Sequence, residues 1–233
     1  MMPSSLTGQS AGRIVEAETD MRGVHIYIDI DDVLAETTRA INDVAESLFG
    51  TRVPFESMVE FDLAHSLHLD SAQHAILWRA IHEPSFLENL TPMENAVATT
   101  NRWHQAGAEI SIVTGRPPES RASSVTWLNR FEIGHDRLEM VDKYGRFAEQ
   151  SSLSKEELAD RPYTWVIEDS LEMAQFFSER TQARVLLMDR PWNQTDGLRF
   201  SRTQRVRDWT AIAIALRDGR VRSEEPIPEN ERP

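Results

Sequence analysis

The stretch His25-Ile26-Tyr27-Ile28-Asp29-Ile30-Asp31-Asp32-Val33-Leu34 places two carboxylates, those of Asp29 and Asp31, at the end of a short apolar run. The run is rich in β-branched and aromatic residues and predicts a buried strand over residues 24–29. In an open parallel sheet the ligand crevice lies beyond the carboxyl ends of the strands, so both side chains are expected to face it. At this spacing one carboxylate can attack phosphorus while the other exchanges a proton with the leaving oxygen. An acidic turn without a catalytic role is the alternative interpretation of this motif taken alone.

A second apolar run, residues 110–113, ends in a segment that suits an anion. Thr114 supplies a hydroxyl, and Gly115 lets backbone N–H groups approach a ligand closely. Arg116 can donate to phosphate oxygens through two of its nitrogens. The segment therefore predicts a phosphate-binding turn at the end of a second strand.

Two later segments complete the set of residues that phosphoryl transfer requires. Lys143 follows a third apolar segment, and the acidic pair Glu168 and Asp169 follows the apolar run 165–167. Taken alone, the lysine is interpreted as a solvated surface residue. Together with the first two motifs, these residues provide carboxylates for a cation and positive charge for a phosphate group.

The chain resembles the haloacid dehalogenase superfamily in four motifs that occur in the same order, which are DIDDV, VTG, DK and VIEDS. The 85 residues from Asp29 to Thr114 leave room for a cap inserted between the first two motifs. More narrowly, the chain is similar to the 5′(3′)-deoxyribonucleotidase family, the cytosolic type C nucleotidases. The segments that carry this likeness are DIDDVLAET, FLENLTPMENA, PWN near residue 192 and VRDWTAIA, and it spans about residues 25–216.

The resemblance implies a Rossmann-like α/β core with a central parallel sheet and a small helical cap of the C1 type. It also implies that Asp29 is the nucleophile, which forms an aspartyl-phosphate, and that Asp31 is the general acid and base. Thr114 and Lys143 would hold the phosphoryl group. Mg²⁺ would be bound by Asp29, by the main-chain carbonyl of Asp31 and by Asp169, with Glu168 acting through water.

Several residues depart from the family pattern. Asp32 stands where the nucleotidases usually carry Gly, and Arg116 is expected to replace the charge of a Lys that the animal enzymes carry in a different segment. In the cap, Phe61, Asp62 and Leu63 align with the stretch that places paired aromatic residues against the base, but only the first is aromatic here. Thr37 likewise replaces a Phe. These residues are candidate substrate contacts, and they predict a pocket more polar than a deoxynucleotide site.

The chain is divided by composition and pattern into a loose leader at 1–22, a core formed by 23–35 and 92–221, a helical cap at 36–91 and a disordered tail at 222–233. Strands and helices alternate along the core, which is typical of a doubly wound α/β fold. The expected core elements are strands at 24–29, 110–114, 138–141, 164–168 and 183–188, and helices at 92–106, 119–130, 154–160 and 170–180.

Composition limits the function classes. The chain has 233 residues, of which 40% are apolar, enough for one α/β core and a small cap. Its formal net charge of −13 argues against nonspecific binding to nucleic acid polymers or anionic membranes. It has no Cys, which excludes disulfides and thiolate metal sites. We find no apolar centre of a signal peptide, so a cytoplasmic enzyme is the default expectation, and homodimer formation stays open.

The sequence thus predicts a Mg²⁺-dependent phosphomonoesterase acting on a small phosphate ester, with a nucleoside monophosphate as the best candidate. The alternatives are a phosphatase for a sugar phosphate or another biosynthetic intermediate, and a noncatalytic phosphate-binding protein. The intact pair of Asp29 and Asp31 argues against the last, because a binding protein does not need the second acid. A zinc site at His65 and His68 is a minor alternative, and four tryptophans are expected to pack in the core, namely Trp78, Trp103, Trp127 and Trp209.

Overall fold

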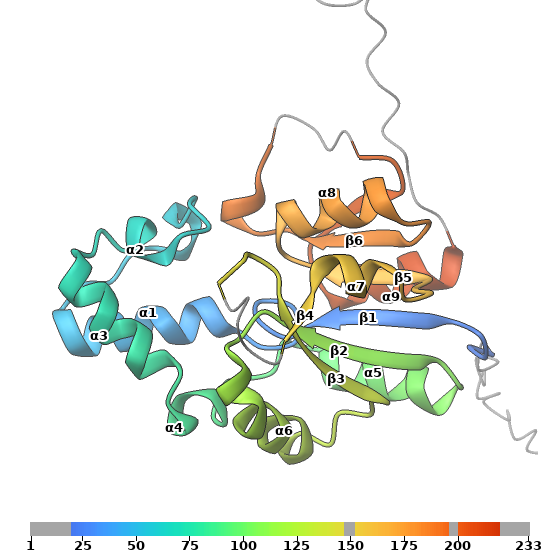
Figure 1. Ribbon diagram of the computed structural model, residues 1–233, viewed down its shortest axis with the longest axis horizontal. Helices are drawn as coiled ribbons and strands as arrows, with labels where there is room; N and C mark the ends of the chain where they lie inside the picture. The colour runs from blue at the N-terminus through green and yellow to red at the C-terminus, as the bar shows by residue number, and fades with distance from the viewer. Residues whose placement is uncertain (1–19, 147–151, 196–199, 220–233) are drawn as a thin grey trace, which may run out of the picture.

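The computed structural model describes residues 20–146, 152–195 and 200–219, and its centre is a single parallel sheet (Figure 1). The seven strands lie in the order β4-β3-β2-β1-β5-β6-β7, and every neighbouring pair is parallel. The chain order reverses on either side of β1, which confirms the predicted doubly wound fold class. The strands are β1 (His25–Asp29), β2 (Glu109–Thr114), β3 (Arg137–Asp142), β4 (Leu153–Ser154), β5 (Trp165–Glu168), β6 (Arg184–Met188) and β7 (Thr203–Val206).

Helices cover both faces of the sheet, because the central strands are apolar on both sides. Ile26 and Ile28 of β1 point into the larger core cluster, and Tyr27 points into a second cluster on the opposite face. The helices of the larger cluster are α5 (Ala96–Gln105), α6 (Arg121–Arg130) and α9 (Trp209–Asp218). The helices of the second cluster are α7 (Lys155–Ala159) and α8 (Leu171–Arg180).

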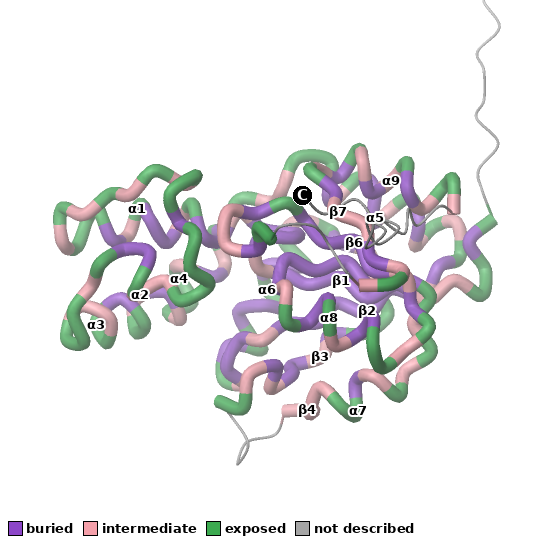
Figure 2. Tube along the Cα trace, turned by 90° about the horizontal axis from the view of Figure 1, so that it is seen from above, coloured by how far each residue is buried: buried purple, intermediate pink, exposed green. Residues whose placement is uncertain are grey.

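A cap of helices lies beyond the carboxyl ends of the strands (Figures 1 and 2). It has its own small core, formed by Ile41, Ala45, Met58, Leu67, Leu77 and Ile81. The two chain segments that join it to the core run side by side, since Ala35 pairs with Pro92 and the amide of Glu36 donates to the carbonyl of Thr91. The cap elements are α1 (Thr37–Phe49), η1 (Phe55–Ser57), α2 (Leu63–Ser66), α3 (Ser71–Ile81) and α4 (Pro84–Leu87).

The helix expected at 92–106 begins four residues later than predicted. Pro92 is used in the pairing with Ala35, and Asn95 adopts a left-handed conformation with φ 64°, so helical geometry starts at Ala96. Two strands were not expected, β4 and β7, and both lie at the edges of the sheet. β4 has only two residues, and β7 contains a single apolar residue, Val206, so neither shows an apolar run.

Three of the four tryptophans expected in the core are there, and Trp78 is not. Trp103, Trp127 and Trp209 are buried, whereas Trp78 is 37% exposed. Helix α3 buries Leu77 against the cap core, and the next residue on a helix points about 100° away. Trp78 therefore faces outward from the cap.

The predicted leader and tail lie almost entirely outside the described residues. Where the description begins, Met21 is buried in the larger core cluster, so the packed core starts earlier than residue 23. Within the described ranges, we find no helix that combines the length and the apolar character needed to span a bilayer.

Candidate active site

The turn after β1 is sharp and places two carboxylates at the end of the sheet. The carbonyl of Ile30 accepts the amides of both Leu34 and Ala35 at 2.9 Å, which closes the loop on itself. Asp32 lies in the left-handed region with φ 55°, a conformation that favours Gly. Its carboxylate accepts the hydroxyl of Thr38, a residue in the first turn of α1, at 2.6 Å. This hydrogen bond stabilises Asp32 in its strained conformation. The departure from Gly at residue 32 therefore keeps the shape of the turn.

Asp29 lies in a buried cluster of ionisable groups with Lys143 and Glu168. The Lys143 ammonium donates to Asp29 Oδ1 at 2.8 Å and to Glu168 Oε1 at 2.5 Å, and all three side chains are nearly inaccessible to solvent. The Tyr27 hydroxyl donates to the same Glu168 oxygen at 2.5 Å, and the amides of Asp169 and Ser170 donate to the other. Glu168 is thus fixed by four donors, and it holds Lys143 beside Asp29.

Burial shifts the pKa of both the acidic and the basic group of this cluster. Burial raises the pKa of Asp29 to about 8, although the positive charge of Lys143 opposes the change. Burial alone would lower the pKa of Lys143, but the carboxylates of Asp29 and Glu168 raise it well above its usual value. The lysine is therefore a fixed positive charge at the end of β3.

Asp31 is paired with Arg116 rather than left free in the crevice. The guanidinium donates through Nη2 to Oδ1 at 2.7 Å and through Nε to Oδ2 at 3.0 Å, and the Thr37 hydroxyl donates to Oδ1 at 2.6 Å. Burial alone would raise the pKa of Asp31, but Arg116 and Thr37 together lower it. The guanidinium is buried, whereas 30% of the Asp31 side chain is exposed.

Three buried carboxylates meet at a point where a cation fits. Among the described residues, Asp29, Glu168 and Asp169 are the group whose ligand atoms all lie within 4.8 Å of one another. The Asp169 carboxylate accepts the Trp192 indole N–H at 2.9 Å, and burial raises its pKa well above the usual value. Carboxylate oxygens suit hard cations such as Mg²⁺.

The charge balance supports a cation at this point. Five carboxyl groups lie at this end of the sheet with three cationic side chains. The carboxyl groups are those of Asp29, Asp31, Asp32, Glu168 and Asp169, and the cations are Lys143, Arg116 and Arg190. A phosphate group would add further negative charge to a buried site. A divalent cation would offset the excess, so the residues present fit the metal that the superfamily implies.

The second motif lies beside Lys143. Thr114 ends β2 in a fully buried position, and its hydroxyl accepts the amide of Arg116 at 3.2 Å. A Cβ at residue 115 would lie 3.3 Å from Cδ of Lys143, so Gly115 leaves space for the lysine to reach Asp29.

The three cap residues singled out from the sequence have different surroundings. Phe61 lies against Tyr144 of the core, with ring centroids 5.4 Å apart, next in sequence to Lys143. The Asp62 carboxylate caps helix α2 by accepting the amide of Ala64 at 2.8 Å. Leu63 packs against the cap core. Of the three, Phe61 is the residue that bridges cap and core.

A second contact between cap and core was missed by sequence reasoning. The guanidinium of Arg146 lies 5.9 Å from the ring centroid of Trp78 and 5.1 Å from that of Tyr144. Trp78 also packs against His82 in a tilted arrangement, with ring centroids 4.3 Å apart. The tryptophan itself could have indicated this contact, but its spacing along the helix resembles that of a residue packed in the core.

The histidines of the cap do not join the carboxylate group. His65 is 77% exposed in its side chain, and its nearest acidic contact is Asp62 at 4.0 Å. In the part of the chain that the structure describes, the potential metal ligands are carboxylates, and His68 is not among them.

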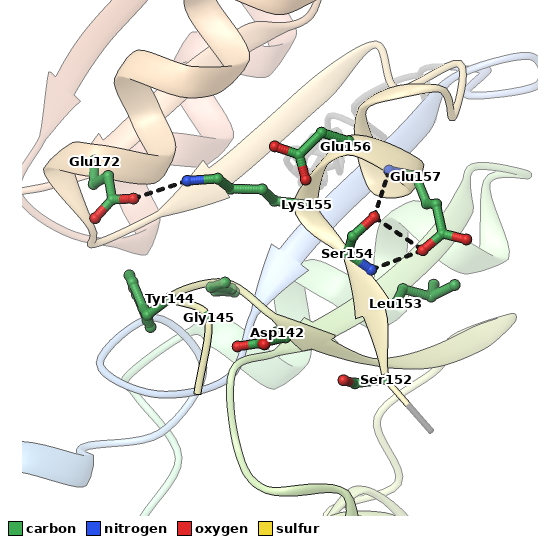
Figure 3. Close-up of a pocket in the computed structure, with 11 residues that line it drawn as sticks. Asp142, Tyr144, Gly145, Ser152, Leu153, Ser154, Lys155, Glu156, Glu157 and Glu172 are labelled. Carbon is green, nitrogen blue, oxygen red and sulfur yellow. Dashed lines mark hydrogen bonds and ion pairs between the residues drawn. The ribbon is translucent and has the colours of Figure 1, made fainter. Parts of the chain in front are cut away.

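A hollow of about 620 Å³ lies beside Lys143, between the end of β3 and helix α7 (Figure 3). Lys155 reaches across it to Glu172 at 3.0 Å, and Ser154 caps α7 through a reciprocal bond with Glu157. These contacts are those of an ordinary surface, and Lys143 is the residue lining the hollow that also bonds to Asp29.

Comparison with known proteins gives one family match along most of the chain. The sequence profile described as 5′ nucleotidase, deoxy (pyrimidine), cytosolic type C protein matches residues 22–217. The search of curated proteins gave no match.

Solved structures share the fold at low sequence identity. A predicted phosphatase from Clostridium acetobutylicum superposes with a TM-score of 0.56 and 10% identity, covering 84% of this chain and 98% of that one. A predicted phosphoglycolate phosphatase from Haemophilus somnus gives 0.53 and 12%, covering 86% and 99%. A HAD-superfamily hydrolase from Ehrlichia chaffeensis gives 0.51 and 13%, covering 86% and 98%.

Proposed function

Since the chain belongs to the cytosolic type C 5′-nucleotidase family of the haloacid dehalogenase superfamily and is a phosphatase, we propose that it hydrolyses nucleoside monophosphates through an aspartyl-phosphate on Asp29. The observation that carries this proposal is the pairing of two differently held carboxylates at the end of β1. Asp29 is fixed by Lys143, and Asp31 is partly exposed beside it.

In the proposed reaction, Asp29 is the nucleophile and Asp31 exchanges the proton. The step starts with one proton on the pair, placed on Asp31 while Asp29 is ionised. An oxygen of Asp29 attacks phosphorus, the bond from phosphorus to the ester oxygen breaks, and that oxygen takes the proton from Asp31. Water then attacks the phosphorus of the acyl phosphate while Asp31 accepts a proton from the water. Phosphate leaves, and both carboxylates return to their first state.

Lys143 and the turn at Thr114 hold the phosphoryl group in this proposal. Lys143 lies 2.8 Å from Asp29, so its ammonium is close to the position that phosphorus would take during attack. Mg²⁺, held by Asp29, the Asp31 carbonyl and Asp169, with Glu168 nearby, would supply further stabilisation of negative charge on the phosphate.

The cap is the part of the chain that contacts the leaving group. Phe61 and Trp78 are exposed aromatic residues at the boundary between cap and core, and they meet Tyr144 and Arg146 on the core side. A planar base can stack on such rings, which favours a nucleotide over a bare sugar phosphate.

The proposed function is tested with a panel of phosphate esters containing nucleoside 5′- and 3′-monophosphates, sugar phosphates and p-nitrophenyl phosphate. We expect hydrolysis with Mg²⁺ and a loss of at least about 10³-fold in excess EDTA, because the metal supplies several kcal/mol of charge stabilisation. The highest kcat/KM should belong to a nucleotide. A sugar phosphate as the best substrate would favour the alternative phosphatase, and full activity in EDTA would contradict the metal site.

The cap contacts lead to a separate prediction about specificity. Phe61→Ala and Trp78→Ala should each lower the ratio of kcat/KM for thymidine monophosphate to that for deoxyribose 5-phosphate. A base–aromatic contact contributes about 1–3 kcal/mol, which corresponds to roughly 5- to 150-fold. The two substrates share the sugar phosphate, so the ratio isolates the base.

Ile76→Ala is the matched control, since Ile76 is exposed on the same helix two residues from Trp78. It should leave the ratio unchanged. If the two aromatic variants also left it unchanged, the base would have to bind elsewhere.

A further inference from the structure

Arg116 makes the most extensive ion pair with a proposed catalytic carboxylate, and its role differs from the one that the sequence suggests. From the second motif, the guanidinium is expected on the phosphate. In the structure it forms a two-point contact with Asp31, through Nη2 to Oδ1 and through Nε to Oδ2. We propose that Arg116 is a positioning residue, which fixes the Asp31 carboxylate for proton exchange with the leaving oxygen. The inference rests on the proposed function.

The arginine is itself rigidly held. Only 4% of its side chain is exposed, and its Nη1 donates to the hydroxyl of Ser124 in α6 at 3.2 Å. Its amide is tied to Thr114 at the end of β2, and Pro117 follows directly. Arg116 is thus held by β2 through its backbone and by α6 through its side chain. Its guanidinium therefore fixes the Asp31 carboxylate, which lies on a loop, relative to these two elements.

The contacts divide the two oxygens of Asp31 into different roles. Oδ1 accepts Nη2 at 2.7 Å, Nε at 3.2 Å and the Thr37 hydroxyl at 2.6 Å. Oδ2 accepts Nε alone at 3.0 Å among the contacts given by the described residues. Oδ2 therefore has more free lone-pair capacity, and we assign it as the oxygen that exchanges the proton.

A phosphate-binding role would leave guanidinium nitrogens directed to the crevice. Instead, three of the five N–H groups of Arg116, one on each nitrogen, donate to Asp31 or Ser124. Because the pair is buried on the arginine side, moving the guanidinium to a phosphate would break a two-point contact. This favours a fixed position for Arg116 during the reaction.

Leaving-group dependence separates positioning from other roles. Alkyl esters such as glycerol phosphate need a proton on the departing oxygen, whereas p-nitrophenyl phosphate departs with little help. Arg116→Ala should lower kcat for the alkyl ester by roughly 10²-fold, the cost of a misplaced catalytic group, and lower it much less for the aryl ester. Inhibition by inorganic phosphate should stay unchanged.

A double-mutant cycle gives the second measurement. In an Asp31→Asn background, Arg116→Ala should have almost no further effect on kcat for the alkyl ester, because the group that it positions is already disabled. Guanidinium chloride at sub-denaturing concentration should partly restore the alkyl-ester activity of the Arg116→Ala variant. The Arg116→Lys variant should have little more of this activity than Arg116→Ala, because an ammonium cannot make the two-point contact. Arg121→Ala is the matched control, since Arg121 donates only to the carbonyl of Leu138 in the described structure.

Other outcomes would overturn the inference. An equal fall for alkyl and aryl esters, together with weaker inhibition by phosphate, would make Arg116 a phosphate ligand. A guanidinium also favours the ionised form of the carboxylate. If Arg116→Ala hydrolysed the alkyl ester faster than the wild type, Arg116 would act only by keeping Asp31 ionised and would not position it. If the alanine variant does not fold, Arg116→Lys and Ser124→Ala carry the same leaving-group test. Wild-type enzyme without Mg²⁺-dependent hydrolysis would instead contradict the proposed function itself.

Discussion

Asp29→Asn should lower turnover of every phosphate ester by about 10⁴-fold or more, because a carboxamide is a poor nucleophile and a poor ligand for a divalent cation. The effect should fall on kcat for aryl and alkyl esters alike, since both need the same nucleophile. The substitution preserves size, and Lys143 keeps its second partner, Glu168, so the variant should remain folded. The measurement is steady-state hydrolysis beside a thermal unfolding curve.

A comparison with Asp31→Asn identifies which carboxylate is phosphorylated. Asp31→Asn should slow turnover by roughly 10²- to 10⁴-fold and still accept a phosphoryl group from a substrate with a good leaving group. Quenched reactions should show one added phosphoryl group, sensitive to hydroxylamine, in this variant and none in Asp29→Asn. Asp43→Asn, on an exposed part of the cap, is the surface control. Wild-type turnover by Asp29→Asn would exclude the aspartyl-phosphate mechanism.

The fold and the placement of the motif residues at the strand ends could be predicted because both depend on short-range patterns. Apolar runs fix the strands β1, β2 and β5, and parallel pairing then brings the residues that follow them to the same edge of the sheet. Asp29, Thr114 and Asp169 therefore lie where the motifs suggest. The spacing does not show which charges pair, since that depends on side-chain rotamers.

The partners of these residues were harder to foresee. Tyr27 looked like an ordinary strand residue, and only the register of β1 against β5 brings its hydroxyl to Glu168. Arg116 was expected on the phosphate and lies on Asp31 instead. Both contacts depend on residues more than 80 positions apart, which no local pattern reports.

The cap was the least predictable part because its polar and aromatic residues suit more than one role. Asp62 was considered as a substrate contact, whereas its carboxylate caps a four-residue helix. Ser, Asp and Asn are favoured at this position for their ability to accept an amide N–H, so the same residue type suits both roles. The exposure of Trp78 depends on which face of α3 the cap core buries, and the sequence of α3 is apolar on more than one side.

Removing Lys143 should have the largest effect on stability, because this lysine compensates two buried carboxylates. Lys143→Met keeps most of the side-chain volume and leaves Asp29 and Glu168 without their shared cation. Breaking a buried ion pair by deleting one partner costs about 3–5 kcal/mol. We expect the free energy of unfolding, measured in urea without metal, to fall by that amount, and hydrolysis to be lost.

Two variants and one ion test the cause of this loss. Adding Glu168→Gln to Lys143→Met should restore part of the stability, since it removes one of the uncompensated charges, and Mg²⁺ should stabilise Lys143→Met more than it stabilises the wild type. Lys155→Met removes a lysine that pairs with Glu172 at the surface and should change stability by less than about 1 kcal/mol. If Lys143→Met were as stable as Lys155→Met, the buried carboxylates would have to be neutral in the free protein. The lysine would then serve the substrate phosphate alone, and the charge balance that argues for a divalent cation at Asp29, Glu168 and Asp169 would lose its basis.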